Sequence, residues 1–426
     1  MRRPRGPLWH NGDFLLLWSA QSVSQVGSQV TGLALPLAAI LVLKATTFEV
    51  AALNVVDLLP FVLFSLPTGV WVDRLRRRPL MIAADWGRGV ALCSIPVAYA
   101  LGDLTLAHLY VVGFVTGTLT VFFDVSYQSY LPSLVDRPEL GDGNSKLEVS
   151  RSSAQVAGPG LAGVLVGAIT APYAIAVDAA SFVVSALLMS AIRRVEELPE
   201  SLATSRRRMH VEIAEGLRYV VGHPIMRPML VWVTASNFFT TLLNAVLLVF
   251  AVRTLHLTAA TIGLTLSLAS IGTVIGALTA TRLSRRFGVG PAMIGFAAVG
   301  GAGMLLIPLA RGGAAIPLLV AGEFVFGFCA IAANVNGISL VQAITPDRML
   351  GRMNASRRFV VWGVIPFGGL LGGALGTEFG LRTALWVGAI GSALAFIALL
   401  PSPLLRIRVL EDAERESASV GGPVST

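Results

Sequence analysis

The chain has 426 residues, of which 54% are hydrophobic and only 13% are charged, and its two cysteines, Cys93 and Cys329, both lie in apolar runs. So large an apolar share excludes an ordinary soluble core, and so few cysteines exclude a secreted disulfide-rich scaffold. Twelve membrane spans of about 20 residues would use about 240 positions and leave enough chain for short loops and two tails. The composition therefore predicts an all-α membrane protein with twelve transmembrane helices.

The first apolar run follows three arginines, Arg2, Arg3 and Arg5, as in a signal peptide. It continues over 14–43 without a clear cleavage site, and we interpret it as a retained first helix. Further spans are expected, in chain order, near 49–72, 79–101, 106–131, 152–170, 174–192, 228–251, 260–281, 291–310, 315–343, 357–377 and 382–400.

The net charge of +8 has to be interpreted by position along the chain, because in a membrane protein it does not indicate nucleic acid. If the N-terminus is cytoplasmic, nearly all of the 32 Lys and Arg residues fall in the tails and in cytoplasmic loops. The other loops hold only Lys44, Arg253, Arg311 and Arg382. Basic residues in short loops stay on the cytoplasmic side, so both termini are expected inside a bacterial plasma (inner) membrane.

A long polar break divides the spans into two groups of six. We expect an N-terminal half at 1–192, a cytoplasmic linker at 193–227, a C-terminal half at 228–400 and a disordered cytoplasmic tail at 401–426. Within the linker, HVEIAEGLRYVV at 210–221 has a loosely helical pattern. That pattern fits either a helix lying on the membrane surface or a plain solvated linker helix.

The two halves also repeat each other, and duplicated six-helix units are typical of secondary transporters. Such proteins bind substrate near the membrane midplane and open alternately to its two sides. The repeat matches Arg74, Leu75, Arg77 and Arg78 with Arg282, Leu283, Arg285 and Arg286, and Leu140, Gly141, Asn144, Gly158 and Gly163 with Leu350, Gly351, Asn354, Gly368 and Gly373.

The segment Gly69-Val-Trp-Val-Asp73-Arg74-Leu-Arg76-Arg77-Arg78 resembles the G-x-x-x-D-R-x-G-R-R loop between helices 2 and 3 of the major facilitator superfamily. Gly69 would permit close helix approach, while Asp73, Arg74, Arg77 and Arg78 would pair with charged helix ends in one conformation and separate in the other. These residues are the candidate conformational gate. The alternative is that the arginines only set topology and meet lipid phosphates.

The second copy of this gate has Ala277, Thr281 and Ser284 where the first has Gly69, Asp73 and Arg76. A gate is therefore expected to be strongest in the first half.

The fifth span contains Ala154-Gln-Val-Ala-Gly158-Pro159-Gly160-Leu-Ala162-Gly163, which resembles the G-x-x-x-G-P-x-x-G-G motif of exporters in that superfamily. Gly158 and Gly163 would let a neighbouring helix approach closely, and Pro159 would let the helix bend. The motif favours export, and ordinary tight packing is the alternative.

Four further segments extend the resemblance over nearly the whole chain and indicate the branch that contains macrolide efflux proteins and the enterobactin exporter. That resemblance implies proton-linked export of a small, often bulky molecule. One family feature is missing, because the arginine often found in helix 4 of proton antiporters would fall on Gly113. The segments are Tyr130-Leu-Pro132, Ser181-Phe182, Glu215-Gly216-Leu217, and Pro346-Asp347 with Gly351-Arg352.

Ionisable residues within spans are costly unless they are paired or hydrated, so each is a functional candidate. Asp57 lies deep in the second span with no cation nearby in sequence, where it could bind a proton or a cationic substrate. The alternative is that it pairs with a cation from another helix. Asp85 and Arg88, three residues apart, also fit a plain buried ion pair. Asp178 is ambiguous, since its carboxylate could reach interfacial water. The candidates for proton coupling are Asp57, Glu323, Asp124, Asp85 and Arg88.

Amide side chains within the spans are candidates to line a substrate cavity, with interhelical hydrogen bonding as the alternative. No phosphate-binding loop, metal-spaced His or Cys set or nucleophile elbow is found, so an ATP-driven pump or an enzyme is disfavoured, and no cofactor or metal is expected. The cavity candidates are Gln21, Gln25, Asn237, Asn244, Asn334 and Asn336.

The preferred hypothesis is a monomeric secondary efflux transporter that exchanges protons for an amphiphilic drug or small metabolite and binds no nucleic acid. A proton-coupled uptake symporter of the same fold is one alternative, and a non-transporting membrane sensor or assembly protein is another.

Overall fold

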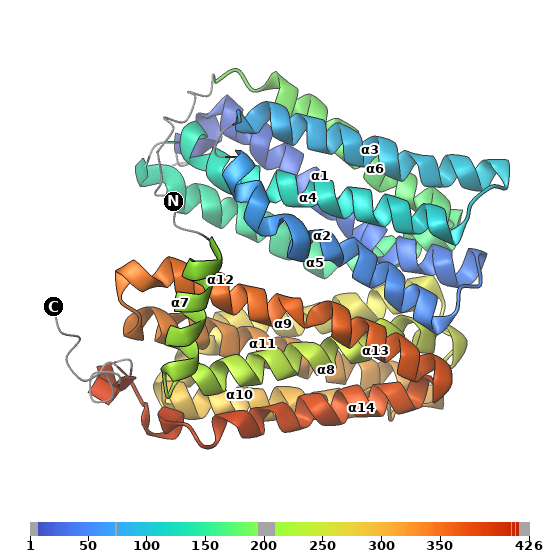
Figure 1. The fold of residues 1–426 in the computed structure, drawn as a ribbon. Helices are drawn as coiled ribbons and strands as arrows, with labels where there is room; N and C mark the ends of the chain where they lie inside the picture. Colours follow the sequence, from blue (N-terminus) through green and yellow to red (C-terminus); the bar gives the residue numbers. More distant parts are fainter. Residues whose placement is uncertain are drawn as a thin grey trace, which may run out of the picture. The chain divides into compact units, whose positions relative to one another are not determined.

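The computed structural model describes residues 7–72, 75–135, 137–194, 209–409, 411–413 and 415–416. Within these ranges the chain forms helices joined by short turns, without a β-strand. The α-helices, drawn in Figure 1, are α1 (Gly12–Leu37), α2 (Thr47–Val72), α3 (Arg77–Leu101), α4 (Leu106–Leu134), α5 (Leu140–Ile169), α6 (Ala171–Ala191), α7 (Met209–Gly222), α8 (Met226–Arg253), α9 (Ala259–Phe287), α10 (Val289–Gly303), α11 (Ala315–Ile344), α12 (Asp347–Gly363), α13 (Ile365–Glu378) and α14 (Leu381–Leu394).

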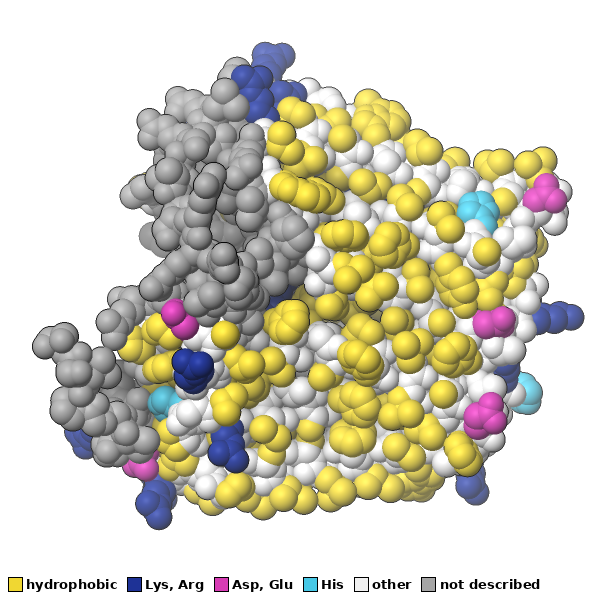
Figure 2. Space-filling view, viewed as in Figure 1, with side chains coloured by type: hydrophobic (Ala, Val, Ile, Leu, Met, Phe, Trp, Pro, Cys, Tyr) yellow, Lys and Arg dark blue, Asp and Glu magenta, His cyan; other side chains and the backbone are white. Residues whose placement is uncertain are grey.

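Twelve helical segments in the described part of the chain are long and apolar enough to cross a membrane, which confirms the predicted fold class. On the face shown in Figure 2, hydrophobic side chains cover the middle of the helices and charged side chains lie toward the helix ends. This distribution is the one that a lipid bilayer requires, because apolar side chains contact the acyl chains and charged groups stay in water.

Some helix boundaries differ from the predicted ones for identifiable reasons. The span expected at 357–377 consists of α12 and α13, which are separated at Val364. Pro366 lies in the first turn of α13, where its missing N–H and fixed φ suit a helix start. The fifth span begins at Leu140 and not near residue 152, because α5 continues beyond its apolar part into a polar segment.

The helices pack as two compact units. The first unit contains α1 to α6 and the segment 256–267, which includes the first turns of α9. The second contains α7, α8, the rest of α9 and α10 to α14. In the first unit, α1 packs on α5 and α6, α2 on α4, and α3 on α4 and α6. In the second, α8 packs on α13 and α14, and α10 packs on α11.

The start of the tail that was expected to be disordered is folded. Pro403–Arg406 forms a short 3-10 helix, and the N–H groups of Val289 and Gly290 donate to the carbonyls of Arg408 and Ile407. Leu404 and Ile407 are buried in the core of the second unit. These two apolar residues anchor the segment to the second unit.

The linker helix exists as α7, and its packing against the second unit is not that of a plain solvated helix. Its position on the membrane surface stays a prediction. The helix packs on α12 and α8 of the second unit and runs crosswise to α8 in Figure 1. Its Tyr219 hydroxyl donates to the carbonyl of Ile344 at 3.3 Å. Val220 is 2% exposed while Val221 is 48% exposed, so Val220 and not Val221 lies on the buried face of α7.

His223 joins α7 to α8 and satisfies the first N–H groups of the second helix. Its Nδ1 accepts hydrogen bonds from Ile225 N–H at 3.2 Å and from Met226 N–H at 3.4 Å. Burial lowers the pKa of the imidazole below its ordinary value. Only the neutral ring can accept at Nδ1, so the folded junction requires an uncharged histidine.

We expect His223→Ala to destabilise the junction by about 1 kcal/mol and His223→Asn to restore most of that loss, because an asparagine oxygen can accept the same bonds. The unfolded chain takes up the histidine proton near pH 6.5, before the folded chain does, so the stabilisation by His223 is complete above this pH and decreases below it. Thermal unfolding in detergent across this range should show an acid-side loss in the wild type. An equal loss in His223→Asn would contradict the assignment.

Candidate functional site

The gate arginines that the structure describes hold helix ends together in the first unit. Arg77 donates through Nη1 to the carbonyl of Ser129 at 3.0 Å, near the end of α4. Arg78 donates through Nε to Met189 O at 3.0 Å and through Nη2 to Ser190 O at 2.6 Å, at the end of α6. Carbonyls at a helix C-terminus attract cations, so these contacts stabilise the observed arrangement. Gly69 lies in α2, and Asp73 and Arg74 lie outside the described residues.

A second set of contacts joins the same helix ends. The carboxylate of Asp13, in the first turn of α1, accepts the backbone N–H groups of Arg193 and Arg194, each at 3.0 Å. The guanidinium of Arg194 donates to Leu134 O at 2.8 Å. Asp13 therefore joins the start of α1 to the residues after α6, and Arg194 joins them to the end of α4. Sequence reasoning did not identify this group, because its members are far apart in the chain.

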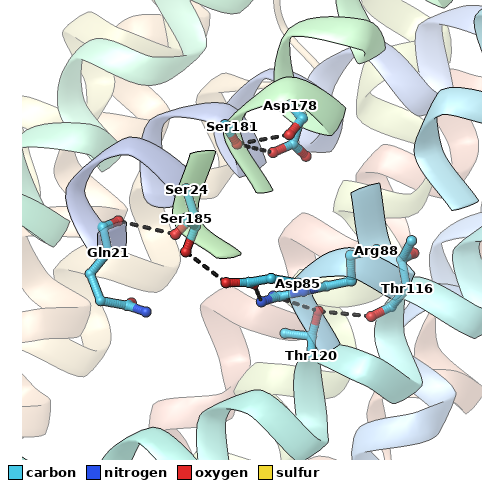
Figure 3. Close-up of polar contacts among 9 residues, drawn as sticks. All are labelled: Gln21, Ser24, Asp85, Arg88, Thr116, Thr120, Asp178, Ser181 and Ser185. Carbon is cyan, nitrogen blue, oxygen red and sulfur yellow. Dashed lines mark hydrogen bonds and ion pairs between the residues drawn. The ribbon is translucent and has the colours of Figure 1, made fainter. Parts of the chain in front are cut away.

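Four side chains from three helices form a buried polar network in the first unit (Figure 3). Asp85 and Arg88 of α3 form an ion pair and are 0% and 5% exposed. Ser185 Oγ of α6 donates to Asp85 Oδ2 at 2.6 Å, and Arg88 Nη1 donates to Thr120 Oγ1 of α4 at 3.3 Å. The geometry agrees with the interpretation of Asp85 and Arg88 as a buried ion pair.

Aromatic rings complete the surroundings of Arg88. Its guanidinium carbon lies 4.5 Å from the ring centroid of Phe123 and 4.1 Å from that of Phe182. Both distances are in the range of a cation–π contact. Arg88 thus connects α3 with α4 and α6 through charge, hydrogen bonding and ring contacts.

Asp178 is buried, which excludes contact with interfacial water in this arrangement. The residue is 1% exposed, and Ser181 Oγ donates to its Oδ1 at 3.0 Å. Gly27 of α1 faces this pair, since a Cβ atom there would lie 2.5 Å from Asp178 Oδ1. The missing side chain of Gly27 leaves room for the carboxylate between α1 and α6.

Asp57 is half-buried in α2 and faces α4 at two glycines. A Cβ atom on Gly117 would lie 2.3 Å from the carbonyl oxygen of Asp57, and one on Gly113 would lie 3.9 Å from Asp57 Cβ. Gly113 is also the position at which proton antiporters of the superfamily often have an arginine, according to the resemblance. In the part of the chain that the structure describes, the Asp57 carboxylate has no hydrogen bond or ion pair.

The remaining acidic candidates differ in their surroundings. Glu323 of α11 has its Oε1 buried without a hydrogen-bond partner among the described residues. Asp124 is half-buried in α4, one turn before Tyr127. Glu323 is therefore the counterpart of Asp57 in the second unit, in the sense that each is a carboxylate inside a span without a paired cation.

The amide candidates do not share one environment. Gln21 and Asn336 are both 6% exposed, and Asn336 donates through Nδ2 to Ala332 O of its own helix at 2.8 Å. Gln25 and Asn237 are half-buried, and Asn244 and Asn334 are exposed. The last four are the amides that are accessible within their own units.

The export motif of α5 makes close backbone contacts. A Cβ atom on Gly158 would lie 2.4 Å from Gln29 Cβ of α1, and one on Gly163 would lie 2.3 Å from Ala259 O in the first turn of α9. The N–H of Gly160 donates to Ser267 Oγ at 2.8 Å. These contacts require glycine, as the packing interpretation expects.

Among the described residues, no group of three or more His, Cys, Asp or Glu side chains could hold a metal ion. In each unit, the candidate residues are thus acids and amides of differing exposure within the spans, and in the first unit they include arginines at the helix ends. Such an arrangement can change protonation and helix-end contacts, which are the elements of a transport cycle.

The chain belongs to the transmembrane secretion effector family of the major facilitator superfamily, whose model matches residues 4–423. It is 23% identical to the multidrug efflux pump Tap of Mycolicibacterium fortuitum over 95% of this chain and 98% of that protein. It is also 23% identical to the enterobactin exporter EntS of Salmonella typhi, over 67% of each chain. These findings confirm the prediction of an efflux transporter of this superfamily, while the substrate and the coupling ion stay predictions.

Solved structures agree on the fold. A bacterial homologue of the iron transporter ferroportin in its inward-facing state superposes with a TM-score of 0.73 at 17% identity, covering 91% of this chain and 98% of the other. The D-xylose-proton symporter gives a TM-score of 0.68 at 15% identity, covering 91% and 97%. The chain is thus a multi-pass membrane protein with the fold of secondary transporters.

Proposed function

We propose that the protein exports an amphiphilic small molecule from a bacterial cell in exchange for protons. Three features support the proposal: a full-length relative that is a multidrug efflux pump, the resemblance of the α5 segment to the exporter motif, and two carboxylates inside spans without a paired cation among the described residues. The observation that carries it is the family match over residues 4–423, because it covers both units. We infer that the protein is a transporter and not an enzyme.

Asp57 and Glu323 are the proposed proton carriers. A carboxylate in an apolar span can alternate between a protonated and a charged form as water reaches it and is excluded again. Neither acid has an ion-pair partner within the described residues, in contrast to Asp85. Asp124, Asp85 and Arg88 remain further candidates. The amides Gln25, Asn237, Asn244 and Asn334, together with the buried Gln21 and Asn336, are the proposed substrate contacts.

The proposed orientation places both termini in the cytoplasm, because the basic residues concentrate in the tails and on one set of loops. The four-part division at 1–192, 193–227, 228–400 and 401–426 belongs to the same proposal. So does a monomeric state, since each chain carries both six-helix halves that a transport cycle needs.

A growth screen tests the proposed function. A sensitive bacterial strain expressing the protein is compared with the same strain carrying an empty vector, across a panel of toxic amphiphiles. Export predicts increased resistance to at least one compound and lower cell content of it. Increased sensitivity with higher content would indicate uptake, and no change across a broad panel, with the protein verified in the membrane, would favour a non-transporting role.

The gate is tested by Asp73→Asn, which should slow turnover more than it weakens substrate binding. The reason is that the gate sets the balance between outward-open and inward-open states without touching the substrate. Transport rate and equilibrium binding of the same compound are measured on the purified variant. Binding that falls in parallel with transport would contradict this division.

A further inference from the structure

An apolar groove opens on the second unit between α9, α10 and α11. It has a volume of about 570 Å³ and is lined almost wholly by hydrophobic side chains. From α10 it takes Pro291, Gly295 and Val299, which lie on one stripe of the helix. From α11 it takes Phe324 and Phe328, which lie one turn apart.

Glycines account for the shape of the groove. A Cβ atom on Gly272 of α9 would lie 2.3 Å from Phe324 O, and one on Gly276 would lie 2.4 Å from Phe328 O. These contacts bring α9 against the backbone of α11 at the two residues whose rings line the groove. Gly295 leaves the α10 side open, because a Cβ atom there would meet no atom within 4 Å.

The basic end of α9 lies at one end of this groove. Leu283 and Phe287 line it, and the exposed arginines Arg282, Arg285 and Arg286 are their neighbours in the last turns of the helix. The Arg286 guanidinium carbon lies 5.7 Å from the ring centroid of Phe287. Within the described residues, none of the three arginines has a hydrogen bond or an ion pair, unlike Arg77 and Arg78.

We propose that this groove binds an anionic phospholipid, with an acyl chain along α10 and the phosphate on Arg282, Arg285 and Arg286. From Pro291 to Val299 the α10 stripe extends about 12 Å, which is most of the hydrocarbon depth of one leaflet. The arginines lie at the end of the span, where the headgroups are, and three cations favour a lipid with net negative charge. The apolar walls of the groove therefore match the acyl chain of a phospholipid, and the arginines at its end match the phosphate.

The internal repeat allows the arginines of the second unit to be compared with those of the first. The equivalent arginines of the first unit, Arg77 and Arg78, donate to the carbonyls of helix ends, whereas those of the second unit have no such contacts among the described residues. The groove of the second unit thus ends at a basic cluster, Arg282, Arg285 and Arg286, whose exposed guanidinium groups can bind an external anion. The proposal is independent of the transported substrate and of the coupling ion.

The test measures lipid binding to the delipidated, full-length protein in detergent. Phosphatidylglycerol and phosphatidylcholine with identical acyl chains are the probes, and glycerol phosphate represents the headgroup alone. Replacing all three arginines (Arg282→Gln, Arg285→Gln and Arg286→Gln) should lower the affinity for phosphatidylglycerol by roughly 150-fold, because each cation near the membrane surface contributes about 1 kcal/mol. It should leave the affinity for phosphatidylcholine nearly unchanged.

Groove-filling variants test the second half of the proposal. Gly295→Leu and Val299→Trp should each weaken phosphatidylglycerol binding, whereas Gly32→Leu, at an exposed glycine of α1 with open space around it, should not. Thermal unfolding verifies that each variant is folded. If one groove variant does not fold, the other still tests the proposal. Equal binding of both lipids, an unchanged affinity in the triple variant, or glycerol phosphate binding as tightly as the intact lipid would overturn the proposal.

Discussion

Replacing Asp57 by asparagine is expected to abolish accumulation driven by a pH gradient, to the level seen in vesicles without the protein. Asparagine retains the size and much of the hydrogen bonding of the acid but fixes the neutral state, so the residue can no longer carry a proton. Folding and passive exchange of substrate across the membrane should persist, because the packing of α2 on Gly113 and Gly117 is unchanged. Gradient-driven uptake and counterflow exchange are measured on the same vesicle preparation.

The matched control for Asp57 is Glu378→Gln, which neutralises an exposed acid at the end of α13. It should transport like the wild type. If Asp57→Asn still concentrates substrate at the wild-type rate with the same pH dependence, Asp57 has a structural role. The proton carrier would then be sought first at Glu323 and next at Asp124 and Asp85.

Replacing Arg88 by leucine is expected to lower the free energy of unfolding by about 3–5 kcal/mol, because it leaves the carboxylate of Asp85 buried without its cation. The remaining bond from Ser185 Oγ at 2.6 Å cannot compensate a full charge. The contacts of Arg88 with the Phe123 and Phe182 rings are lost as well. Unfolding in detergent, followed by thermal and denaturant methods, measures the loss.

Two comparisons make the Arg88 result specific. Arg151→Leu breaks an exposed pair with Glu148 at 3.8 Å and should cost at most about 1 kcal/mol. A double variant, Asp85→Leu with Arg88→Leu, should recover much of the stability that Arg88→Leu loses, because no unpaired charge remains. A single variant as stable as Arg151→Leu would contradict the prediction that Asp85 is left buried, charged and unpaired.

The number of spans and the α3 ion pair could be predicted from the sequence because both depend on local pattern. Apolar runs of bilayer length identify helices whatever they pack against, and a spacing of three residues puts Asp85 and Arg88 on one helix face. The helical pattern of α7 could be found in the same way. Its buried face could not, because that face depends on α12, which is distant in the chain.

Features that depend on long-range packing could not be predicted. Asp178 near the end of a span could have faced water, and only the gap left by Gly27 of α1 explains its burial. Asp13 accepts hydrogen bonds from Arg193 and Arg194, which are 180 and 181 residues away in the sequence. A hydropathy pattern cannot predict a contact between such distant residues. The resemblance drew attention to Gly113, but only the structure reveals that Asp57 faces it.

The most direct measurement of proton-coupled export uses inverted membrane vesicles containing the protein, a compound identified by the growth screen, and an imposed gradient with an acidic vesicle interior. The lumen of such vesicles corresponds to the cell exterior, so an exporter that exchanges protons should concentrate the compound inside as protons leave, and a protonophore should release it. Accumulation only in right-side-out vesicles, driven by external acid, would contradict export and establish uptake by symport.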